Sequence, residues 1–141
     1  MIAVEVKKEE GREKVLWVSK HDPLPAQIRE IRRKIPDAEI IVEKGFFASA
    51  EEVAEIARQH NAKVIIAVVP LSFLARLVEF KEFTLLYADM ELVRTEREYP
   101  EVDRDCETVV PAYQGRERVY KVYRFKQFKR IKGIKLELED F

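Results

Sequence analysis

The predicted fold of this chain follows from the stretch Val15-Leu16-Trp17-Val18-Ser19-Lys20-His21-Asp22-Pro23. Its first four residues are apolar, which is typical of a strand covered on both faces. Pro23 and Pro25 follow, and proline is tolerated in the first turn of a helix because no amide donor is needed there. The stretch therefore predicts a buried strand that leads directly into a helix, with Asp22 as the helix cap.

On either side of this stretch, strand and helix patterns alternate along the chain. Alternating apolar and charged residues predict an edge strand over 2–7. Six consecutive apolar residues over 64–69 predict a central parallel strand buried on both faces. Apolar side chains at helical spacing mark the segments between the strands. The predicted helices span 24–35, 50–60 and 71–78, and the other predicted core strands span 39–42 and 83–88.

This order predicts an α/β fold, a small Rossmann-like domain with a parallel core sheet flanked by helices over residues 1–90. After Asp89 no helical spacing is found. A C-terminal antiparallel β-meander or hairpin over 91–141 is expected instead. A length of 141 residues suits a single domain. The extended segments predicted in this second part span 92–95, 108–113, 119–128 and 131–138.

The composition indicates the class and the environment of the protein. Hydrophobic residues make up 47% and charged residues 37%, which excludes a disordered chain. Lys, Arg and Glu are abundant, whereas Asn61 and Cys106 are the only residues of their types, a pattern typical of thermophiles. One cysteine and two histidines supply neither a disulfide nor a Cys/His zinc site, so no metal is expected.

Two further features of the sequence bear on its cellular location. The first residues lack the long apolar core of a signal peptide. No apolar run reaches the roughly 18 residues that a membrane span needs. We therefore expect a cytoplasmic protein that does not bind a membrane.

The net charge is zero, but the charges are segregated along the chain. Residues 79–107 contain ten acids and four bases. Residues 108–135 contain nine bases and one acid. The neutral total therefore conceals an acidic segment followed by a basic one.

The polar residues after the first strand form the candidate ligand site. In open α/β folds, ligands bind just beyond the carboxyl ends of the strands, which is where Ser19, Lys20 and His21 lie. Gln27 and Ser72 are expected to line the same pocket. If the protein is an enzyme, His21 would act as acid or base and Lys20 would steady charge, in a metal-independent cleavage of a phosphodiester.

A purely structural interpretation of the same residues stays open. Neighbours in an extended segment point in alternating directions, so these side chains cannot converge as a catalytic triad. Ser19 would then bond the local backbone. The chain contains no G-x-G-x-x-G and no phosphate-loop motif, so no dinucleotide cofactor is expected.

The basic segment near the C-terminus is the second candidate site. Its bases are interleaved with aromatic residues, a composition suited to neutralising phosphates while stacking on bases. The alternative is a half-buried strand whose cations simply occupy the solvent face. The residues expected to contact phosphates are Arg124, Lys126, Lys129 and Arg130.

The segment from Leu16 to Gln27 resembles the opening of small, uncharacterised Rossmann-like proteins of archaeal, phage and plasmid mobile elements. These are distantly similar to the CRISPR-associated domains that bind cyclic oligonucleotides, the CARF-like domains. In those proteins a strand ends in Ser-x-His, and a helix then begins with a Thr-Pro-Glu-Gln type of sequence. Ser19, His21, Pro25 and Gln27 match that pattern, whereas Leu24 and Ala26 replace its threonine and glutamate. The resemblance implies a nucleotide-sensing or ring-nuclease-like fold.

Together these observations predict an accessory protein that binds a nucleotide, a cyclic oligonucleotide or a nucleic acid. Binding without turnover is favoured over catalysis. The alternative is a non-enzymatic interaction module, in which the acidic and basic segments pair between subunits and the C-terminal strands form a homodimer.

Overall fold

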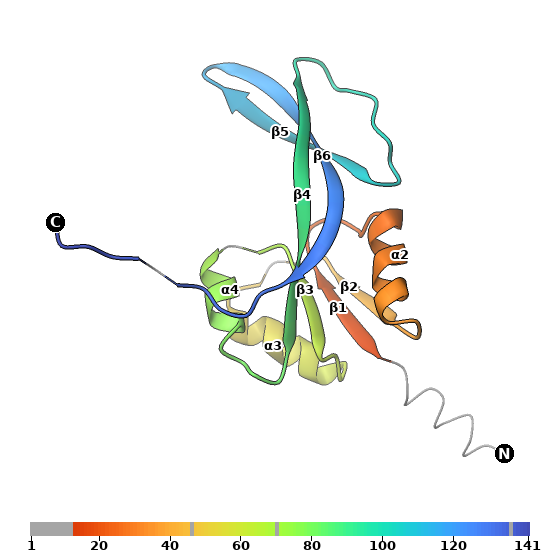
Figure 1. Cartoon of the computed structure of the whole chain (residues 1–141), viewed down its shortest axis with the longest axis vertical. Coiled ribbons are helices and arrows are strands. Elements are labelled where there is room, and N and C mark those ends of the chain that lie inside the picture. The colour runs from red at the N-terminus through yellow and green to blue at the C-terminus, as the bar shows by residue number, and fades with distance from the viewer. Residues whose placement is uncertain (1–12, 46, 70, 136) are drawn as a thin grey trace. The chain divides into compact units, whose positions relative to one another are not determined.

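The computed structural model describes residues 13–45, 47–69, 71–135 and 137–141. Within these ranges the chain forms helices and strands that are labelled in Figure 1. The predicted edge strand over 2–7 lies outside the described residues. The helices are α2 (Pro25–Lys34), α3 (Ala50–Gln59) and α4 (Leu71–Leu77). The strands are β1 (Lys14–Val18), β2 (Glu39–Glu43), β3 (Val64–Ala67), β4 (Thr84–Glu96), β5 (Glu107–Gln114) and β6 (Glu117–Arg130).

The strands form one six-stranded mixed sheet in the order β2-β1-β3-β4-β6-β5. β1 lies between β2 and β3 and runs parallel to both, so Val15 pairs with Ile40 on one side and with Val64 on the other. β3 also pairs in parallel with β4. β5 and β6 are antiparallel, and β5 is an outer strand of the sheet.

The predicted fold class is therefore wrong. The strands do not form a parallel Rossmann-like core flanked by helices with a separate β-rich extension, because a single mixed sheet contains all six of them. The segments 83–88 and 92–95, predicted as separate strands, are parts of the 13-residue strand β4. The described residues of 131–138, predicted as a further strand, belong to no strand.

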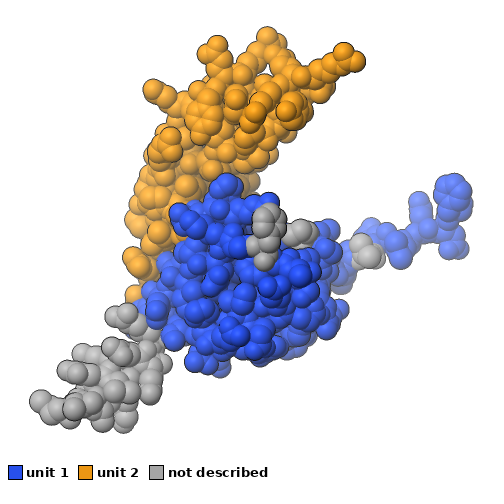
Figure 2. Space-filling model, turned by 180° about the vertical axis from the view of Figure 1, so that it is seen from behind, with its two compact units in different colours: residues 1–22, 37–87, 130–141 blue, residues 23–36, 88–129 orange. Residues whose placement is uncertain are grey.

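The chain divides into two compact units, shown in different colours in Figure 2. Unit 1 comprises Met1–Asp22, Asp37–Tyr87 and Arg130–Phe141. Unit 2 comprises Pro23–Pro36 and Ala88–Lys129. The helix after β1 therefore groups with the C-terminal hairpin, and the helices of unit 1 are α3 and α4. This grouping is a second departure from the predicted core.

The core of unit 1 forms where apolar strand residues meet the small residues of α3. Leu16 of β1 and Ile65 of β3 are fully buried in this core. Ala54 and Ala57 of α3 pack in the same cluster, and small side chains allow a helix to approach a sheet closely. α3 and α4 lie next to each other.

Unit 2 contains α2, the hairpin of β5 and β6, and the outer part of β4. Val119 and Val122 of β6 are buried. α2 is fastened to the segment before β5, because the Ala26 N–H donates to the Asp105 carbonyl at 2.9 Å and the Arg29 guanidinium binds the Asp105 carboxylate. That hydrogen bond from the guanidinium lowers the pKa of Asp105.

The structure tests the predicted helix ends. Ser49 caps the start of α3, since its Oγ accepts a hydrogen bond from the Glu52 N–H at 3.2 Å. Asn61 follows this helix in the left-handed conformation, with φ of 57°, which asparagine tolerates at helix ends. The prediction for Asp22 is wrong. α2 begins after Leu24, and Asp22 pairs with Lys44 instead.

Candidate functional site

The polar residues after β1 form a compact turn stabilised by backbone contacts. Ser19 is buried, and its Oγ accepts a hydrogen bond from the His21 N–H at 3.2 Å. The indole Nε1 of Trp17 donates to the His21 carbonyl at 2.9 Å. Both the backbone N–H and the backbone carbonyl of His21 are therefore hydrogen-bonded, while the residue as a whole is exposed to solvent.

A cavity of about 210 Å3, here called the strand-end cavity, lies at the carboxyl ends of β1 and β3. Two of the predicted site residues, Ser19 and Lys20, line it. His21 and Ser72 do not belong to its described lining. Ser72 lies within α4 and is exposed. The lining consists of Val18, Ser19, Lys20, Gly45, Phe47, Val68, Val69 and Phe73.

Gln27, a predicted ligand-binding residue, has a structural role in unit 2. Its side chain is buried, and its Oε1 accepts a hydrogen bond from the Leu24 N–H at 2.8 Å at the start of α2. Its Nε2 contacts the Met90 sulfur at 3.6 Å. The amide thus satisfies a helix terminus that would otherwise leave backbone donors without partners.

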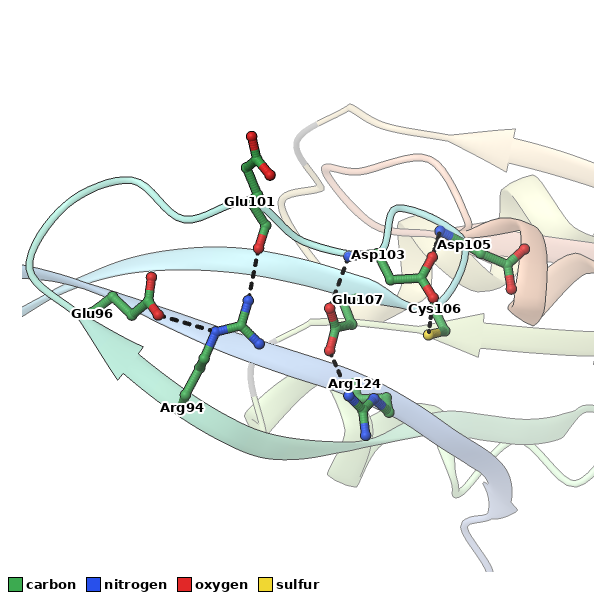
Figure 3. Close-up of polar contacts among 8 residues, drawn as sticks. All are labelled: Arg94, Glu96, Glu101, Asp103, Asp105, Cys106, Glu107 and Arg124. Carbon is green, nitrogen blue, oxygen red and sulfur yellow. Dashed lines mark hydrogen bonds and ion pairs between the residues drawn. The ribbon is translucent and has the colours of Figure 1, made fainter.

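Among the four bases predicted to contact phosphates, Arg124 is engaged with a buried acid (Figure 3). Its guanidinium lies 2.9 Å from the Glu107 carboxylate, whose side chain is only 4% exposed. The Asp103 N–H donates to the same carboxylate at 2.8 Å. This backbone hydrogen bond, together with Arg124, lowers the pKa of Glu107. Arg124 is thus needed to compensate a buried charge.

The other three predicted bases differ in their surroundings. Lys129 Nζ lies 3.6 Å from the Asp89 carboxylate. Lys126 is exposed and makes no ion pair with the residues that the structure describes. Arg130 lines a second cavity of about 210 Å3 in unit 1, here called the basic cavity. Its lining consists of Val78, Lys81, Phe83, Leu85, Arg130, Ile131 and Lys132.

The backbone positions the cations of the basic cavity. The Ile131 N–H donates to the Leu85 carbonyl at 2.8 Å, and the Ile131 side chain packs against the core of unit 1. This anchor places Arg130 and Lys132 on either side of a fixed residue. Lys81 comes from the turn before β4, next to Phe83, whose ring packs edge-on against Phe80 at 6.5 Å.

Sequence reasoning missed Lys81 and Lys132 as members of one site. Lys81 belongs to the acidic segment, and 51 positions separate it from Lys132, so no local pattern connects the two. The hydrogen bond between Ile131 and Leu85 is what brings them together. The strand-end cavity carried a weak signal, the apolar residues that follow Gly45 directly after a predicted strand.

Two other kinds of site can be assessed from the described side chains, a cluster of metal ligands and a reactive thiol. In the ranges that the structure describes, no three His, Cys, Asp or Glu side chains gather as metal ligands would. Desolvation raises the pKa of the Cys106 thiol, and the neighbouring Asp103 adds to this effect. A raised pKa disfavours the thiolate, which is the nucleophilic form.

A comparison with protein-family models found no match for this chain, and a comparison with curated proteins found none either. The resemblance of Leu16–Gln27 to CARF-like proteins therefore stays a prediction. None of the helices that the structure describes combines the length and the apolar character needed to cross a lipid bilayer.

Proposed function

We propose that this protein binds nucleic acid and that the basic cavity holds its phosphate groups. The observation that carries the proposal is the convergence of Lys81, Arg130 and Lys132 on one cavity whose described lining contains no acid. None of the three makes an ion pair with a described residue. Arg130 differs in this respect from most of the other described arginines, which have a carboxylate partner.

Electrostatics supports an anionic ligand at this place. Three like charges in one cavity repel one another, and a bound phosphate would relieve that repulsion. The chain as a whole is neutral, so binding would depend on this local field and not on the net charge. A phosphate backbone supplies the negative charge, and each contact releases condensed counterions.

The test is a titration of a short fluorescently labelled single-stranded oligonucleotide, followed by anisotropy at several salt concentrations. The triple variant Lys81→Gln, Arg130→Gln, Lys132→Gln should lose at least about tenfold in affinity, because several phosphate contacts disappear at once. The slope of log K against log salt should fall by up to about 2, at roughly 0.7 per phosphate on a single strand.

The matched control changes three other exposed cations that make no ion pair with described residues: Arg32→Gln, Lys34→Gln, Lys63→Gln. It alters the net charge by the same amount but leaves the basic cavity intact. Its affinity and salt slope should stay near those of the unmodified protein. An equal loss in both triple variants would show that only the total charge matters, and it would sink the proposed site.

The alternative of pairing between subunits has less support from the structure. The acidic and basic segments already pair within unit 2, through Arg124 with Glu107, Lys129 with Asp89, and Arg97 with Glu117. These charges are therefore satisfied inside one chain. Nucleic-acid binding would instead use Lys81, Arg130 and Lys132, which make no ion pair with a described residue.

A further inference from the structure

A short acidic stretch follows the basic cavity along the chain. Residues 137–140 have the sequence Glu-Leu-Glu-Asp, and all four are exposed. Their three carboxylates make no ion pair with a described residue. Within the described ranges, three unpaired acids are therefore matched in number by the three unpaired cations that line the basic cavity, Lys81, Arg130 and Lys132.

The connection between the cavity and the segment 137–140 is short enough for the two to meet. Glu137 comes five positions after Lys132, a span of at most about 18 Å for a fully extended chain. Gly133 follows Lys132 directly, and a Cβ there would meet no atom within 4 Å, so the chain has room to turn at this glycine. So short a tether keeps the acids near the cavity at an effective concentration on the order of millimolar.

The charges of the two parts are complementary. In an extended segment Glu137 and Glu139 project to the same side, so both carboxylates can face the cavity at once. The described lining of the cavity contains no acid that would repel them. Carboxylates and phosphates both accept charge-assisted hydrogen bonds from lysine and arginine, so they compete for the same donors.

We propose that the segment 137–140 binds in the basic cavity of its own chain and competes there with nucleic acid. The competition rests on the proposed function of this cavity, whereas the contact itself does not. Nucleic acid would bind only those molecules whose cavity is free, so its apparent affinity falls in proportion to the free fraction. The exposed segment in the structure is the released form.

The first test neutralises the segment with Glu137→Gln, Glu139→Gln, Asp140→Asn and repeats the anisotropy titration with the labelled single-stranded oligonucleotide. The affinity at low salt should rise at least about threefold, the gain expected if the segment occupies the cavity two-thirds of the time. The gain should shrink as salt is added, because salt screens contacts between exposed charges. Such contacts contribute little to stability, so the melting temperature should hardly change.

The matched control is Asp37→Asn, Glu39→Gln, Glu98→Gln. These three acids are also exposed and make no ion pair with a described residue. The control changes the net charge by the same amount and should leave the affinity nearly unchanged. Equal gains in both variants would mean that only the net charge matters, and they would overturn the competition.

A second measurement detects the contact without nucleic acid. Cys106 is the only cysteine, so Cys106→Ser with Phe141→Cys provides a single attachment site for a nitroxide spin label. The label should broaden the backbone amide resonances of Lys81 and Phe83, and neutralising either the three acids or the three cavity cations should abolish this effect. Unbroadened resonances, or broadening that arises only between molecules in a mixed sample, would overturn a contact within one chain.

The competition and the nucleic-acid site can fail separately. If Lys81→Gln, Arg130→Gln, Lys132→Gln retains full affinity for the oligonucleotide, the nucleic-acid site and the competition are both wrong, while the spin label still tests the contact. If that variant loses affinity but the variant of segment 137–140 binds like its matched control, the nucleic-acid site stands and the competition is overturned.

Discussion

Glu107 shows how one buried acid determines the roles of its neighbours. Its carboxylate accepts the Asp103 N–H and binds the Arg124 guanidinium (Figure 3). The sequence indicated phosphate binding for Arg124 because that residue belongs to a basic run. Its actual partner lies 17 positions earlier, on the paired strand, where the register sets Glu107 opposite Arg124. No local pattern encodes that register, so the pairing could not be predicted.

Glu107→Gln should make the protein less stable at neutral pH, lowering Tm by several degrees. The hydrogen bond from the Asp103 N–H and the charge of Arg124 lower the pKa of Glu107 in the folded state. Its contribution is therefore fully present above the unfolded-state pKa of about 4.3 and is lost as the pH falls through the lower folded-state value. Thermal melts from neutral pH down to acid should show the variant and the unmodified protein converging below about pH 4.

The control for this experiment is Glu139→Gln, which removes an equal charge from an exposed residue near the C-terminus. Its melting curve should follow that of the unmodified protein at every pH. A constant gap between Glu107→Gln and the unmodified protein down to strongly acidic pH would mean that ionisation of Glu107 does not underlie the effect.

At the scale of the element, Pro111 explains how the outer strand β5 tolerates its exposed edge. The Phe125 N–H donates to the Cys106 carbonyl, which makes these two residues a hydrogen-bonded pair. Such pairs alternate along an antiparallel ladder, so Pro111 and Tyr120 form a pair without hydrogen bonds. The nitrogen of Pro111 therefore faces away from β6. Because this nitrogen does not face β6, the lack of an N–H removes no hydrogen bond from the hairpin. It leaves one donor fewer along the outer edge of β5.

Pro111→Thr should promote association of the protein through β5, because it restores a donor in the middle of an outer edge. Light scattering across a range of protein concentrations should detect a larger mean mass than in the unmodified protein. Val110→Thr is the control, since Val110 is exposed on the same strand but its N–H faces β6. A monomeric Pro111→Thr protein would show that this proline does not protect the edge.

The elements differ in how well the sequence predicted them. The helix over 50–60 and the strand over 15–18 have strong apolar spacing or a clear cap, and the structure confirms both within one residue at each end. Asp89 and Glu91 interrupt the apolar pattern, so the sequence indicated a strand end where β4 continues. A polar residue in mid-strand is compatible with an exposed strand face, and this ambiguity led to the wrong fold class.

At the scale of the whole molecule, two groups of cations differ in whether they make ion pairs with carboxylates of the described chain. Arg58 and Arg76 bind carboxylates of other segments, Glu82 and Glu51, and both lie over the Phe80 ring. The hydrogen bond to Glu82 raises the pKa of Arg58 further. These residues connect α3, α4 and the turn before β4. The three cations of the basic cavity make no ion pair with a described residue, so they make no such connection.

The triple variant Lys81→Gln, Arg130→Gln, Lys132→Gln should therefore melt at the same temperature as the unmodified protein or slightly above it, because it relieves repulsion and removes no ion pair among the described residues. Arg29→Gln, Arg58→Gln, Arg76→Gln removes the same charge from paired positions and should melt clearly lower. Oligonucleotide at about 100 times the Kd of the unmodified protein should stabilise that protein by about 2.7 kcal/mol, and it should stabilise the cavity variant by no more than about 1.4 kcal/mol, because the affinity of this variant is at least about tenfold lower. Differential scanning calorimetry measures all of these, and a cavity variant that melts well below the unmodified protein would assign its three cations to the fold and not to a ligand.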